Sequence, residues 1–152
     1  MERNNESQKG GGFMAEWISL KTNWVSTDRF NIADYNRIKN NIKWLCDKAN
    51  QLYKEYEYAE MGNDIATTDS YWKVEYFNAF EKNIEEINKN ILTKDYGVSQ
   101  RFFENGPFIK WDELNRIENA CERMKKILDN QELARTVRIS FRLGNTLKGV
   151  NV

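Results

Sequence analysis

The sequence predicts a mainly α-helical protein, in which three long helices with heptad-like seams form a helical bundle or a coiled-coil-like arrangement and a short C-terminal β-hairpin follows. Three observations predict this fold class. The 152 residues include a single proline, which favours long helices over a sandwich with many turns. Three stretches space their apolar residues by threes and fours, as in the seam between packed helices. The end of the chain changes to the period-two pattern of a half-buried strand.

The chain has the length of one domain, and its 40% hydrophobic and 30% charged residues suit a protein with a core. Composition and pattern divide it into four parts. We expect a flexible leader over residues 1–12, an extended apolar segment over 13–30, a helical bundle over 31–134 and a β-ribbon tail over 135–152.

The first helix signal begins at Asn31, which is a good N-cap residue, and Asp34 completes a variant of the capping box. The helix is expected to end between Ala59 and Gly62, because Gly62 suits the position after a helix end. Its seam consists of Tyr35, Ile38, Ile42, Leu45, Ala49, Leu52 and Tyr56.

Two further helices are predicted, one over about residues 70–93 and one that starts near Trp111 or Asp112. The seam of the second is Phe77, Phe80, Ile84, Ile87 and Ile91, and that of the third is Leu114, Ile117, Cys121, Met124 and Leu128. Connections of about ten residues favour antiparallel neighbours in a bundle.

In the tail, Val137, Ile139, Phe141 and Leu143 alternate with polar residues, and Gly144-Asn145 fits a hairpin turn. A two-stranded ribbon is marginal alone, and its open edge favours pairing. We therefore expect a homo-oligomer, a trimer in preference to a dimer, with residues 135–152 at or near the interface.

The chain contains nearly the same phrase twice: NRIKN at 36–40 and NRIEN at 115–119. The structural interpretation is a helix-start module, in which Ile38 and Ile117 are equivalent core residues and Asn36 and Asn115 bond the capping loop. This interpretation makes the charged members solvated: Arg37, Lys39, Arg116 and Glu118. A direct binding role for the repeat is the alternative.

The extended segment contains two tryptophans for which three roles are possible. Trp17 and Trp24 are expected to be buried, to contact a partner, or to stack on a glycan. Val137, Ile139 and Phe141 of the ribbon are further candidates for partner contact.

Several function classes lose support from the composition. No histidine is present, which removes the commonest general base and metal ligand. Net charge is zero, so no field favours nucleic acid, and no apolar run suits a membrane span. Cys46 and Cys121 are more typical of two buried thiols than of a disulfide. We expect no enzymatic activity, cofactor or metal.

The phrase WDELNRIENAC resembles a helix of minor structural, baseplate and tail-fibre proteins from phages and prophages of Gram-positive bacteria. The resemblance rests on Glu113, Leu114, Asn115, Ile117, Glu118 and Asn119. The copy at 34–40 is looser, with Tyr35 in place of leucine and Lys39 in place of glutamate.

The resemblance implies a non-enzymatic structural component of a phage tail, made in the bacterial host cytoplasm, with other tail proteins as partners. Contact with a host glycan stays open. The alternative function is a helical adaptor or regulatory protein of a bacterial host that binds a protein partner through a helix face.

Overall fold

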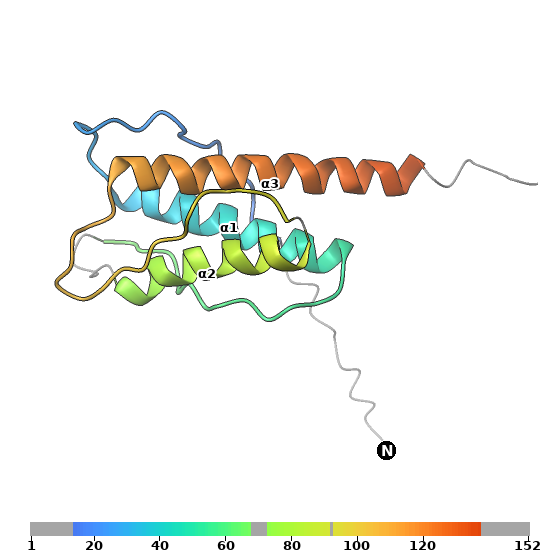
Figure 1. Ribbon diagram of the computed structural model, residues 1–152, viewed down its shortest axis with the longest axis horizontal. Helices are drawn as coiled ribbons and strands as arrows, with labels where there is room; N and C mark the ends of the chain where they lie inside the picture. Colours follow the sequence, from blue (N-terminus) through green and yellow to red (C-terminus); the bar gives the residue numbers. More distant parts are fainter. Residues whose placement is uncertain (1–13, 68–72, 92, 138–152) are drawn as a thin grey trace, which may run out of the picture.

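The computed structural model describes residues 14–67, 73–91 and 93–137. It is mainly helical, as predicted, with α1 (Ile32–Leu52), α2 (Val74–Asn90) and α3 (Trp111–Val137) packed as a bundle (Figure 1). Three extended stretches accompany the helices. We call them the leading segment (residues 14–31), the first connection (53–67) and the second connection (93–110).

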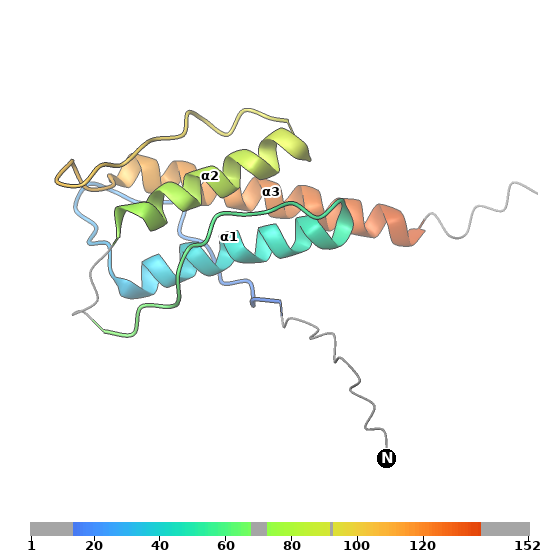
Figure 2. The ribbon, with the colours of Figure 1, turned by 90° about the horizontal axis from the view of Figure 1, so that it is seen from below.

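All three helices run in the same direction, so the expected antiparallel arrangement is wrong. In Figures 1 and 2 each helix begins at the same end of the bundle, and each connection returns along its full length. The physical reason is the length of the connections. About twenty residues separate successive helices, and an extended chain of that length spans a long helix.

The predicted seams form the core. Apart from Tyr56 and Ile91, which lie beyond the helix ends, every seam residue is buried. The helix starts meet in an aromatic layer, where the ring of Tyr35 lies 5.6 Å from that of Phe77 and 5.4 Å from that of Phe80. The periodicity therefore identified the buried face of each helix.

The two ends of α1 differ from each other in how well they were predicted. Asn31 and Asp34 make the expected capping box, with both hydrogen bonds at 3.1 Å. The predicted end at 59–62 is wrong, because the helix stops at Leu52. Beyond it, the side chain of Asn50 binds the backbone of Tyr56 and turns the chain back along the bundle.

Helix α3 is the longest and projects beyond the ends of α1 and α2 (Figures 1 and 2). Val137, predicted to lie in the ribbon, is its last residue, so the ribbon does not begin at 135. The sequence of this last part, QELART, contains several good helix formers, and Arg135 bonds the carbonyl oxygen of Leu52. The rest of the predicted hairpin, including Ile139 and Phe141, lies outside the described residues.

Candidate functional site

Asparagine side chains fasten the extended stretches to the helices. In each case the asparagine side chain makes two hydrogen bonds to the backbone of one other residue. Its amide oxygen accepts from the N–H of that residue, and its amide nitrogen donates to the C=O of the same residue. We call this arrangement a clip. The described residues contain six clips: Asn36 on Ile65, Asn41 on Ile18, Asn50 on Tyr56, Asn78 on Phe102, Asn83 on Ala59 and Asn115 on Trp24.

Each extended stretch is held by two helices. The leading segment is clipped by Asn41 of α1 and Asn115 of α3. The first connection is clipped from α1 and by Asn83 of α2. The second connection is clipped by Asn78 of α2, and the Arg123 guanidinium of α3 donates to the Asp95 carbonyl oxygen at 2.8 Å. Every pair of neighbouring helices is thus bridged by an extended stretch.

The repeat is explained by the clips. Asn36 holds Ile65 with bonds of 2.8 and 2.9 Å, and Asn115 holds Trp24 with bonds of the same lengths. Both residues therefore bind a distant extended stretch, and the expected bonds to the capping loop are wrong. Ile38 and Ile117 lie in the core, each 1% exposed.

A third copy of the phrase lies in α2, where sequence reasoning missed it. Asn78-Ala79-Phe80-Glu81 occupies the same place as residues 36–39 and 115–118. Asn78 makes the equivalent clip, and Phe80 is 1% exposed. The available signal was the asparagine that follows the first seam residue in all three helices. The described residues therefore form three segment-and-helix units, in which the equivalent asparagine of each helix clips a stretch that belongs to another unit.

The second position of the phrase links the helices. Arg37 pairs with Asp34 three residues before it and with Glu118 of α3, both at 2.6 Å. Arg116 pairs in the same way with Glu113, at 2.9 Å, and with Glu81 of α2. The prediction that these charged residues are solvated is wrong for a physical reason: the side chains of Arg37 and Arg116 are only 14% and 15% exposed, and a carboxylate of opposite charge takes the place of water beside each guanidinium.

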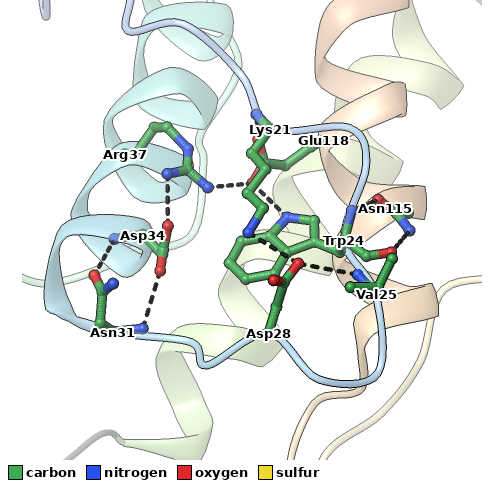
Figure 3. A network of polar contacts seen from close by, with 9 residues as sticks. All are labelled: Lys21, Trp24, Val25, Asp28, Asn31, Asp34, Arg37, Asn115 and Glu118. Carbon is green, nitrogen blue, oxygen red and sulfur yellow. Dashed lines mark hydrogen bonds and ion pairs between the residues drawn. The ribbon is translucent and has the colours of Figure 1, made fainter.

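Glu118 is the centre of a buried polar network (Figure 3), and its side chain is fully buried. Its carboxylate accepts from the backbone N–H of Lys21 at 2.5 Å, from the Trp24 indole at 3.1 Å and from Arg37. The Lys21 ammonium lies 3.9 Å from the centroid of the Trp24 ring and pairs with Asp28 at 2.9 Å. One carboxylate thus joins α1, α3 and the leading segment.

The surroundings of Arg37 and Glu81 shift the pKa of each side chain. Burial alone would lower the pKa of Arg37, but its bonds with Glu118 and Asp34 outweigh burial and raise this pKa. Burial raises the pKa of Glu81, against the opposing charge of Arg116. The Oε2 atom of Glu81 is buried and has no hydrogen-bond partner among the described residues.

The third link in the ring of helices is different. The α2 position that matches Arg37 and Arg116 is Ala79, and the α1 position that matches both glutamates is Lys39. Lys39 is buried and donates to the Gly62 carbonyl oxygen at 3.2 Å, while it also pairs with Asp64 of the first connection. Here a helix-to-connection contact replaces a helix-to-helix contact.

The tryptophans of the leading segment have separate environments. Trp24 is 2% exposed and bonded to Glu118, which confirms the expected burial and leaves no exposed ring for the alternative contact with a partner or a glycan. Trp17 is half-buried, with its ring 5.2 Å from that of Trp44 and the Lys125 ammonium 5.4 Å away. Trp17 lines a hollow of about 480 Å³ between the leading segment and α3.

Metal binding, thiol chemistry and membrane insertion are three further possibilities for the residues that the structure describes. Within residues 14–67, 73–91 and 93–137, no group of three histidine, cysteine or carboxylate side chains is arranged to hold a metal ion. Cys46 and Cys121 are buried free thiols, as expected, and burial raises the pKa of both. None of the described helices is long and apolar enough to cross a membrane.

Comparison of the chain with family models, with curated proteins and with solved structures gave no match. The site is therefore defined by its own geometry: six clips and two arginine–glutamate links that hold three extended stretches on three parallel helices.

Proposed function

We propose that this protein is a non-enzymatic structural component of a phage or prophage tail, which connects or positions other tail proteins. The observation that carries the proposal is the use of the buried polar groups. Arg37, Glu118, Arg116 and Glu81 are directed at other elements of the chain, and the asparagine amides are directed at its backbone. Such a network favours a rigid body for assembly over a site that changes protonation or binds substrate.

The tail assignment itself rests on the resemblance of residues 113–119 to helices of tail-associated proteins. It implies that the protein is made in the bacterial host cytoplasm, becomes part of the virion tail and contacts other tail proteins and further copies of itself. The fold supports this role by presenting a helix, α3, that projects beyond the ends of the other two helices (Figure 1).

The test is the composition of purified particles. Tails are isolated by density gradient from the bacterium that encodes the protein, and the chain is quantified by mass spectrometry against the major tail protein. A fixed ratio across gradient fractions is expected. If the protein stays in the cytoplasmic fraction and co-purifies with a host protein, the adaptor function replaces the tail function.

A further inference from the structure

The end of the bundle where the helices begin carries an exposed apolar surface. A contiguous exposed apolar patch, unlike scattered apolar side chains, is a mark of an interaction surface. The four large apolar side chains of this patch come from the leading segment, the second connection and the start of α3. We call the set the aromatic end, and its members are Val25, Phe103, Phe108 and Trp111, with exposed fractions of 52, 63, 56 and 47%.

Two hollows shape this surface, and Phe108 lines both of them. A hollow of about 530 Å³ is lined by Val25 and Trp111, and a second of about 390 Å³ is lined by Phe103 and Pro107. Lys110 also lines both hollows. The aromatic end therefore offers depth as well as apolar area, which suits the insertion of apolar side chains.

The opposite end of the molecule carries a second apolar element. Helix α3 projects there (Figure 2), and its Leu133 is 64% exposed. The chain continues for fifteen residues after Val137, and this part of the sequence contains Ile139, Phe141 and Leu143. We call Leu133 together with residues 138–152 the C-terminal end.

The two ends are poorly placed to meet within one chain. From Trp111 to Val137 the helix is about 39 Å long at 1.5 Å per residue, so residues 138–152, which span at most about 50 Å, would have to return nearly straight. Each pair of neighbouring helices is already bridged by an extended stretch. Within the described residues, a returning segment would therefore have to share each seam between helices with a stretch that already lies there.

We propose that the protein associates end to end, with the C-terminal end of one copy covering the aromatic end of the next. Such a contact is heterologous, because it joins two different surfaces. A pair of copies joined by one such contact keeps one unused surface of each kind, so assembly continues until the contacts close, in an antiparallel pair or a larger ring, or extends as a filament. The inference does not depend on a tail function, since it concerns only the two ends of this chain.

Complementary variants of the full chain test the proposal. The acceptor variant carries Phe103→Glu and Trp111→Glu, and the donor variant carries Leu133→Glu and Phe141→Glu. Val98→Glu is the matched control, because Val98 is 79% exposed in the middle of the second connection. Circular dichroism establishes that each variant is helical, and Phe103→Ser with Trp111→Ser replaces the acceptor variant if it does not fold.

Light scattering after size exclusion then gives the mass of each species at high micromolar concentration. The parent and the control are expected to form assemblies of two or more copies, and each variant alone is expected to be a monomer. An equimolar mixture of the two variants is expected to form a heterodimer and nothing larger, because only one productive contact remains.

Three results would overturn the proposal: a monomeric parent, a donor variant that still forms dimers through its aromatic end, or a mixture that does not associate. Salt provides a separate check. The rim of the aromatic end has mixed charge, with Arg101 and Lys110 beside Asp112, so apolar contact should drive association. Assemblies are expected to persist in about 1 M salt, where charge pairs are screened, and dissociation there would contradict an apolar contact.

Discussion

The first and third helices carry nearly the same phrase, yet the fourth letter has opposite charge in the two copies. Lys39 of α1 and Glu118 of α3 are both buried and occupy equivalent places. Glu118 accepts three hydrogen bonds from two other elements. Lys39 pairs with Asp64, whose side chain is 59% exposed, and with one backbone carbonyl oxygen.

The difference shows what the fold requires at this position. A buried charge needs a partner of the opposite sign, and the nearest extended stretch or helix supplies it. The clips at Asn36 and Asn115 do not differ in this way, because every residue except proline offers both a backbone N–H and a C=O. Backbone recognition by asparagine is therefore the part of the unit that repeats, while the charged link varies.

The largest expected effect comes from the carboxylate. Glu118→Ala leaves Arg37, the Trp24 indole and the Lys21 N–H without their acceptor, and the loss should be about 3–5 kcal/mol in free energy of unfolding. Lys39→Ala should cost clearly less, because its acidic partner stays solvated. Urea unfolding of both variants measures the difference, and equal losses would show that the two copies carry equal weight.

The two isoleucines of the phrase should behave alike. Ile38→Ala and Ile117→Ala each remove a side chain that is 1% exposed, so each should lower the free energy of unfolding by about 2–5 kcal/mol. Thermal and urea melts check this expectation. Variants that melt like the parent would remove the core role and strengthen a direct binding role for the repeat.

The clips should contribute less individually. Asn36→Ala and Asn115→Ala each leave one backbone N–H and one C=O without partners, at a cost of about 1–3 kcal/mol. Asn119→Ala is the matched control, since Asn119 belongs to the same phrase and is exposed. If Asn119→Ala lowers the free energy of unfolding as much as the clip variants do, the loss comes from the change in helix propensity and not from the clip.

The smallest effect is a pH dependence from Glu81. Its pKa is raised in the folded protein by burial, so the folded state binds this proton more tightly than the unfolded state. Stability from this group is present below the unfolded pKa of about 4.3 and is lost as pH rises through the folded pKa. Glu81→Gln has no such proton to lose.

Melting temperatures of the parent and of Glu81→Gln between pH 4 and pH 8 measure this effect. The parent should lose stability relative to the variant as pH rises, whatever the constant offset from the lost link to Arg116. A difference that grows in the opposite direction would show that the charged form of Glu81 is the one the fold favours.

The sequence was most informative where local spacing alone determines which face of a helix is buried. The spacing of Leu114, Ile117, Cys121 and Met124 identified the buried face of α3, and Asn31 with Asp34 marked the start of α1. The asparagines were visible but their partners were not, since a clip joins residues as far apart as Trp24 and Asn115. Their common place after the first seam residue of each helix was the signal for a third unit.

By itself the sequence determined three amphipathic helices, their core residues and the absence of histidine chemistry, because composition and local spacing express these directly. The tertiary structure alone decided that the helices are parallel, that the Trp24 indole is bonded to Glu118 and that the Glu118 carboxylate is shielded from solvent. The physical reason is that the burial of a charged or amide side chain depends on whether a partner from another element reaches it. Glu118 could be read as solvated until Arg37, Trp24 and Lys21 were brought to it from other elements.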